Sequence, residues 1–131
     1  MNLRFASFEL AMSDDLVPMW REAFEHGVGI VDSNPIEGQR AHLIERVWPE
    51  HAVTVAFGDG GRLVGFVASN ASSISQLYVR MGWHRLGIGS ALLARAKAAS
   101  GGSLWLYTFA RNANARHFYE LRGFVATAFG F

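Results

Sequence analysis

Two glycines, Gly87 and Gly89, lie where an apolar, strand-like run gives way to a helix-like run. The first N–H groups of a helix have no intrahelical partner, and the helix dipole adds partial positive charge at that end. Glycines at this point leave the amides open to an anion, and no Asp or Asn stands in the first turn to occupy the position from within. The spacing therefore predicts a site for a phosphate group.

Two familiar glycine-rich nucleotide loops do not fit this sequence. A dinucleotide-binding loop would place a third glycine at Leu92, and a P-loop would need a Gly-Lys-Ser/Thr sequence, which this loop lacks. Both are rejected. A glycine pair that only permits a tight turn stays open as the alternative to an anion site.

A second group of residues that could bind a ligand or take part in catalysis follows downstream. Asn112, Ala115 and Tyr119 are spaced at i, i+3 and i+7, so they share one face of a predicted helix. Asn112 suits the N-cap of that helix. The Tyr119 hydroxyl either takes part in the chemistry or belongs to a half-buried aromatic side chain whose hydroxyl has a hydrogen-bond partner. The neighbouring residues expected to be structural are Phe118, Leu121 and Gly123.

Hydrophobic periodicity predicts the elements that must position these groups. Strands are expected over residues 3–8, 52–57, 62–68, 73–80 and 104–109, followed by a short β-like tail. The first helix is expected to begin at a cap within Ser13–Asp15, with Pro18 in its first turn, and to end at Gly27–Gly29. The second is expected to run from a cap at Asn34, followed by Pro35, to Trp48. Two further helices are expected over residues 88–99 and 112–122. This order predicts one α/β domain over residues 1–131, an α+β arrangement with a central mixed sheet flanked by helices and a parallel strand pair around the glycine-loop helix.

Composition excludes several classes of function. Of the 131 residues, 50% are hydrophobic and 18% are charged, and no apolar run approaches the roughly 20 residues of a membrane span. A soluble, cytoplasmic protein is therefore expected, since no leader pattern follows Met1. The chain has no cysteine, its histidines show no ligand-like spacing, and its net charge of +1 comes without a basic cluster. No metal, nucleic-acid or membrane site is expected.

The loop from His84 to Gly89 resembles motif A of the GNAT family of N-acetyltransferases, a strand followed by Gln/Arg-x-x-Gly-x-Gly/Ala and a helix. His84 stands in place of Gln or Arg, and Met81 where the family often has proline. The resemblance implies that loop amides bind the pyrophosphate of acetyl-coenzyme A, and that Leu77 and Val79 pair with the pantetheine arm like an added strand. The implied cofactor-binding residues are Leu77, Val79, His84, Arg85, Leu86, Gly87, Ile88, Gly89, Ser90, Asn112, Ala115 and Tyr119.

The run from Asn112 to Phe124 is similar to a second motif of the same family, Asn-x-x-Ala-x-x-Phe-Tyr-Glu-x-x-Gly-Phe. Two motifs in the expected order are more specific than one. By this resemblance, the helix face of Asn112 lies against the cofactor. Tyr119 is the candidate proton donor to the leaving thiolate, and the amide of Val79 is the candidate donor to the oxyanion.

The resemblance implies transfer of an acetyl group from acetyl-coenzyme A to a primary amine, on a small molecule or a peptide, by direct attack in a ternary complex. A non-catalytic acyl-coenzyme A binding or sensing module is the alternative, because Ser73–Gln76 lacks the carboxylate that the family often places there. The general base is unassigned. Its candidates are Glu22, Glu25, His26 and Asp32, with a water chain as an equal alternative, and the possible walls of the acceptor site are Trp20, Phe24, Trp48 and Tyr78.

The sequence ends at Phe131, where the family normally continues through a further strand. Either the C-terminal strand is short or missing, or the sequence is a truncated piece of a longer chain. A short sheet exposes an apolar edge, so a homodimer is possible.

Overall fold

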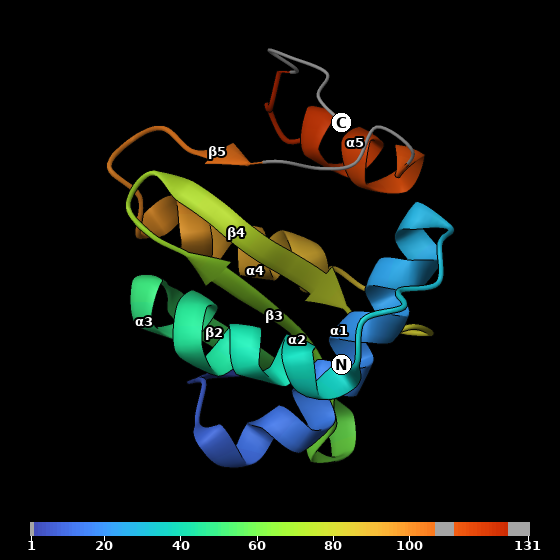
Figure 1. Cartoon of the computed structure of the whole chain (residues 1–131). Coiled ribbons are helices and arrows are strands. Elements are labelled where there is room, and N and C mark those ends of the chain that lie inside the picture. The colour runs from blue at the N-terminus through green and yellow to red at the C-terminus, as the bar shows by residue number, and fades with distance from the viewer. Residues whose placement is uncertain (1, 107–111, 126–131) are drawn as a thin grey trace.

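The computed structural model describes residues 2–106 and 112–125, and its centre is a five-stranded sheet (Figure 1). The strands, in spatial as well as chain order, are β1 (Arg4–Ser7), β2 (Ala52–Phe57), β3 (Leu63–Ser69), β4 (Ser73–Val79) and β5 (Trp105–Leu106). The first four pair antiparallel, whereas β4 and β5 run parallel. The predicted mixed sheet, with a parallel pair around the glycine-loop helix, is confirmed.

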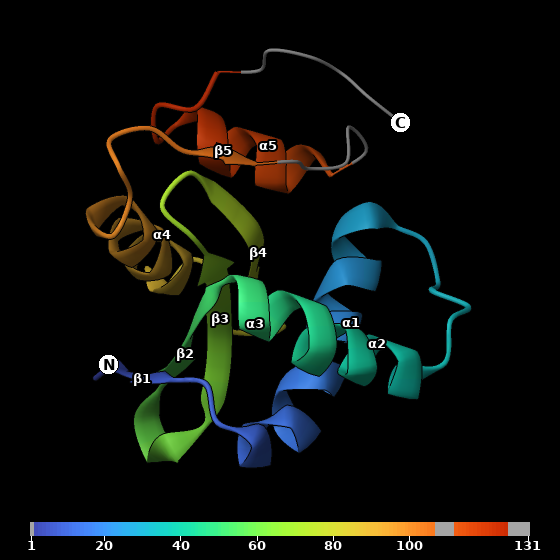
Figure 2. The ribbon, with the colours of Figure 1, turned by 60° about the vertical axis from the view of Figure 1, so that its left-hand side comes forward.

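Helices cover both faces of this sheet (Figure 2). One face carries α1 (Ser13–Val28), α2 (Ile36–His42), the π-helical turn η2 (Leu43–Val47) and α3 (Trp48–Glu50); the other carries α4 (Ile88–Ala98). The last helix, α5 (Ala113–Glu120), lies above β4 and β5, and two short 3₁₀ turns, η1 (Leu10–Met12) and η3 (Asp59–Gly61), complete the fold. Each face of the sheet buries its own apolar cluster.

The contact between α4 and the sheet is close because β3 carries a glycine at the crossing. A Cβ on Gly65 would lie 2.9 Å from the carbonyl oxygen of Tyr78 and 3.1 Å from Cδ1 of Leu92. Both β3 and α4 are buried here, with Ile88 and Leu92 almost without exposure. This packing fixes the first turn of α4 against the end of β4.

The start of α1 differs from the prediction. Its N-cap is Met12, at the end of η1, and no side chain caps it. The Ser13 hydroxyl instead accepts a hydrogen bond from Arg40 Nη1 at 2.7 Å, because α2 packs beside this turn. Pro18 lies inside the helix rather than in its first turn.

The second predicted helix also differs. It begins at Ile36 with Pro35 as an uncapped N-cap, so the predicted Asn34 cap and Pro35 start were wrong. The N–H of Asn34 donates to Asp32 Oδ1 at 2.9 Å, which forms a local turn before the helix. The stretch then passes through the π turn η2 rather than continuing as one α-helix.

Part of the sequence prediction lies outside the described residues. The predicted strand over 104–109 is seen at Trp105–Leu106, and positions 107–109 and the tail from 126 onward are not described. The homodimer and the short C-terminal strand therefore stay predictions. Among residues 2–106 and 112–125, no helix combines the length and apolarity needed to cross a membrane.

Candidate active site

The loop between β4 and α4 ends in a helix start that exposes main-chain amides. Gly87 is the N-cap with φ 83°, and no side chain caps the helix. The first bond within the helix runs from Ala91 N–H to Gly87 O at 3.0 Å, so the N–H groups of residues 88–90 have no intrahelical acceptor. Arg85 also adopts a left-handed conformation, with φ 64°, which costs a non-glycine residue about 1–3 kcal/mol. This is the geometry of an anion site.

Gly87 and Gly89 are required in the loop for different physical reasons. Gly87 is needed for its positive φ, and a Cβ there would meet open space. A Cβ on Gly89 would lie 3.2 Å from two ring carbons of Phe118 on α5. Gly89 therefore permits close packing of α5 on α4, rather than clearing a path for the anion as the sequence suggested.

The structure confirms that Asn112, Ala115 and Tyr119 share one side of α5, and it confirms the predicted N-cap of this helix. Asn112 Oδ1 accepts the N–H of Ala115 at 3.1 Å, so Asn112 is the N-cap of α5. Its side-chain amide also lies against the end of α1, where a Cβ on Gly27 would come within 2.6 Å of Asn112 Nδ2. Asn112, Ala115 and Tyr119 all face one cavity.

That cavity has a volume of about 1220 Å³ and joins four parts of the chain. Its wall comprises β4, the glycine loop with the first turn of α4, the inner face of α5, and the C-terminal half of α1 with the following loop and α2. Every predicted cofactor-binding residue lies in this wall except Leu86, whose side chain is 52% exposed. The structure thus brings together residues that lie far apart in the sequence.

The outer edge of β4 presents main-chain groups to this cavity. The N–H of Arg80 donates to Val64 O at 2.7 Å, and β4 is in regular register with β3 over residues 77–79. Because successive residues of a strand point their main-chain groups to opposite sides, those of Leu77 and Val79 point away from β3. On that side, the described part of β5 pairs only with Ser73 and Ile74.

Comparison with known proteins identifies the family. The profile described as the acetyltransferase (GNAT) family matches residues 11–124. The chain belongs to the GNAT family. No curated protein matches the sequence significantly.

Solved GNAT-like structures share this fold at low sequence identity. The PaiA N-acetyltransferase of Thermoplasma acidophilum, solved with coenzyme A, is 21% identical with a TM-score of 0.77 over 95% of this chain and 91% of that one. The ribosomal-protein-alanine N-acetyltransferase of Brucella melitensis biovar Abortus is 19% identical, with a TM-score of 0.73 over 99% and 96%. YncA of Salmonella typhimurium, solved with acetyl-coenzyme A, is 16% identical, with a TM-score of 0.74 over 96% and 81%.

Tyr119 of this GNAT chain is enclosed by aromatic rings. Its ring meets those of Phe118 and Phe124 edge-on, with centroids 5.1 and 5.4 Å away. Burial raises the pKa of the Tyr119 hydroxyl far above its ordinary value, and Tyr78 adds to the shift. The hydroxyl is therefore a firmly protonated hydrogen-bond donor, and complete proton transfer to a thiolate is harder than the ordinary pKa implied.

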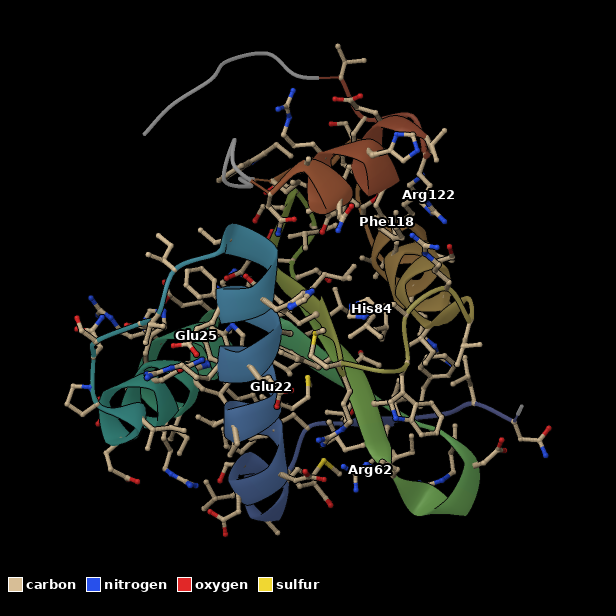
Figure 3. The ribbon with its side chains drawn as sticks, turned by 90° about the vertical axis from the view of Figure 1, so that its right-hand side faces the viewer. Glu22, Glu25, Arg62, His84, Phe118 and Arg122 are labelled. Carbon is tan, nitrogen blue, oxygen red and sulfur yellow. The ribbon has the colours of Figure 1, made fainter. Side chains whose placement is uncertain are left out.

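His84 extends from the glycine loop into the space between α1 and α4 (Figure 3). Partial burial lowers its pKa below the ordinary value, and His26 on α1, also in the wall, adds to the lowering. A neutral imidazole can accept a proton. The family motif had assigned His84 to cofactor binding alone, so this second capacity comes from its position opposite α1.

The four predicted candidates for the general base differ in whether they line the cavity. Glu22 is exposed and lies outside the cavity wall, while Glu25, also outside, accepts the N–H of Asp32 at 2.6 Å. Asp32 lies in the wall, with its Oδ2 3.8 Å from Arg21 Nε, and His26 is in the wall as well. Of the four candidates, His26 and Asp32 are the two that line the cavity, and Asp32 is paired with Arg21.

The predicted aromatic walls are confirmed in part. Trp20, Phe24 and Tyr78 line the cavity. Trp48 does not, because its ring packs edge-on against Phe8, with centroids 4.8 Å apart in the core. Burial also raises the pKa of Tyr78, which a hydrogen bond with Trp20 partly offsets.

Arg122 is a site residue that the sequence reasoning missed. Its Nε and Nη2 donate to Ser90 Oγ at 3.0 and 2.7 Å, Nη1 donates to Phe118 O at 2.9 Å, and the guanidinium lies 3.9 Å from the Phe118 ring centroid (Figure 3). A fixed cation thus stands beside the first turn of α4. Nothing local in the sequence signals this contact, because Ser90 and Arg122 are on different helices.

Proposed function

We propose that this chain transfers the acetyl group of acetyl-coenzyme A to a primary amine by direct attack in a ternary complex. The observation that carries the proposal is the single cavity of about 1220 Å³, which reaches from the first turn of α4 to the walls made by α1 and α2. Its volume exceeds the usual range of about 300–1,000 Å³ for one ligand. Donor and acceptor therefore fit in one continuous space.

The donor half of the cavity suits coenzyme A. The open amides of residues 88–90 and the Arg122 guanidinium bind the pyrophosphate. The outward main-chain groups of Leu77 and Val79 pair with the amides of the pantetheine arm. Two of the similar structures were solved with coenzyme A or acetyl-coenzyme A, which supports this assignment.

The transfer needs a neutral amine and a stabilised oxyanion. The amine nitrogen attacks the thioester carbon, the N–C bond forms and the C–S bond breaks, while the amide of Val79 stabilises the oxyanion and the Tyr119 hydroxyl donates to the thiolate. Deprotonating an ordinary primary amine at pH 7 costs about 4.6 kcal/mol. His84 and His26 face the cavity and accept this proton.

The test is a thiol-release assay with acetyl-coenzyme A and panels of amines, run beside calorimetric titration of the cofactor. We expect cofactor binding together with acceptor-dependent release of coenzyme A. Failure to bind acetyl-coenzyme A would overturn the donor site. Release without acceptor dependence would overturn the ternary complex.

A non-catalytic acyl-coenzyme A sensor is the second candidate. It is favoured by the wall of β4, which carries no carboxylate, and by Asp32, the only carboxylate in the described wall, which is ion-paired with Arg21. Acetyl-coenzyme A binding without turnover of any amine would select this candidate over the transferase.

A further inference from the structure

Arg21 lies in the acceptor half of the cavity wall with a hydrogen-bond donor left over. Its Nε donates to Gln39 Oε1 at 2.6 Å, and its Nη1 donates to the carbonyl of Asp32 at 3.3 Å. The side chain is only 15% exposed, and the buried Nη2 has no partner among the described residues. Because an unsatisfied buried donor is costly, the hydrogen-bonding capacity of this guanidinium is incompletely used in the free chain.

The guanidinium of Arg21 is also held in a fixed orientation. Gln39 belongs to α2 and Asp32 to the loop before it, so two separate segments fix the plane of the guanidinium. A planar guanidinium presents several N–H donors side by side, so it matches the two oxygens of a carboxylate better than a neutral carbonyl.

The charges around the cavity favour the same ligand chemistry. The charged side chains of the described wall are Arg21, Asp32, Arg85 and Arg122, beside the imidazoles of His26, His42, His84 and His117. Asp32 is occupied by Arg21 and by the N–H of Asn34. Arg85 and Arg122 belong to the donor half, so the acceptor half of the described wall carries only the charges of Arg21 and Asp32, which are paired with each other. A polycationic acceptor would need several free carboxylates, whereas an acceptor with its own carboxylate does not.

We propose that the acceptor is a small primary amine that also carries a carboxylate, of the amino-acid class, and that the guanidinium of Arg21 binds the carboxylate. This inference rests on the proposed function. The reaction is unchanged: the amine nitrogen bonds to the acetyl carbon, the C–S bond breaks, and the proton leaves the nitrogen for a cavity imidazole. The carboxylate is bound and takes no part in the bond changes.

Matched triplets of acceptors test the proposal. Each common amino acid is compared with its carboxamide and with its decarboxylated amine, in the thiol-release assay at saturating acetyl-coenzyme A. We expect kcat/KM for the best amino acid to exceed that of both partners by about tenfold or more. The carboxamide has the less basic amine, so a preference for the carboxylate cannot come from amine protonation.

Spermidine and a peptide blocked at its C-terminus complete the panel. Faster turnover of either, or equal turnover within the triplets, would overturn this inference and leave the proposed transferase standing. No turnover of any acceptor would overturn the transferase itself, and this inference with it.

Arg21 variants then locate the carboxylate. Arg21→Gln and the milder Arg21→Lys are expected to raise KM for the amino acid about tenfold or more while leaving KM for its carboxamide within about twofold. Arg62→Gln is the matched control, since Arg62 is exposed and lies outside the cavity wall (Figure 3). An equal loss on both acceptors would show that Arg21 only holds the loop in place, and would overturn its assignment as the carboxylate ligand.

Discussion

At the scale of single residues, the enclosed hydroxyl of Tyr119 sets a limit on the chemistry. Burial raises its pKa, so in the proposed mechanism it donates a hydrogen bond to the departing thiolate without giving up its proton. A hydrogen bond to a charged group contributes about 1.5–3 kcal/mol. Tyr119→Phe should therefore lower kcat by about 10–100-fold and leave acetyl-coenzyme A affinity within a few fold, as measured by steady-state kinetics and calorimetry. Unchanged turnover would remove Tyr119 from the mechanism.

His84 gives a second prediction at this scale, on pH. Its folded pKa lies below the ordinary value of about 6.5 because of burial and His26, so the unfolded chain binds the proton more readily. The contribution of His84 to stability is therefore fully present above about pH 6.5 and is lost as pH falls through the folded pKa. Turnover falls in the same window, because the protonated imidazole accepts no proton.

An NMR titration of the His84 ring checks this directly. We expect a midpoint below about 6.5, moved upward by His26→Asn, since that variant removes the neighbouring charge. His42→Asn removes another imidazole of the wall and should leave the midpoint in place. A wild-type midpoint at or above the ordinary value would contradict the assignment.

At the scale of elements, the position of α4 depends on its close approach to β3. Gly65→Ala places a Cβ 2.9 Å from the main-chain oxygen of Tyr78 on β4 and 3.1 Å from Cδ1 of Leu92 on α4, so the backbone of β3 or β4 must shift and Leu92 must give way. We expect a loss of about 1–3 kcal/mol in the free energy of unfolding, measured by urea denaturation. Gly38→Ala is the matched control: a Cβ there meets nothing within 4 Å, and alanine should stabilise α2 by about 0.5–1 kcal/mol. Equal effects of the two variants would contradict this account of the packing.

The elements also show what the sequence could predict. Periodicity located every described strand and the main helices, because burial on one face imposes a pattern that is readable along the chain. The cap of α1 was mispredicted because the Ser13 hydroxyl accepts a hydrogen bond from Arg40 on α2, which packs beside it. The cap of α2 was mispredicted because Asn34 belongs to a local turn, in which its N–H donates to Asp32. The π turn at Leu43–Val47 left no local signal in the sequence.

At the scale of the whole molecule, the two halves of the cavity differ in how far the sequence predicted them. The half of the wall made by β4, α4 and α5 comes from two contiguous motifs, so nearly all of the residues predicted from them do line one cavity. The acceptor half depends on contacts between separate segments, such as Arg21 with Gln39, and Arg122 reaches the donor half from another helix. Contacts of this kind follow from the arrangement of α1, α2, α4 and α5, which a linear pattern does not encode.

Binding of coenzyme A would connect the helices on the two sides of the cavity, and this gives a prediction for the stability of the whole fold. Coenzyme A would contact β4, α4 and α5, and Asn112 links α5 to Gly27 of α1, so binding stabilises the helices on both sides of the cavity. A ligand at 100 times its Kd raises the free energy of unfolding by about 2.7 kcal/mol. For a domain of this size, the melting temperature should rise by about 10 °C. Pantetheine at the same concentration lacks the phosphates that the α4 amides and Arg122 bind, so it should give a much smaller shift in the same melting experiment. Equal shifts for the two ligands would contradict a phosphate site at the start of α4, and Arg122→Gln should reduce the shift for coenzyme A while leaving that for pantetheine unchanged.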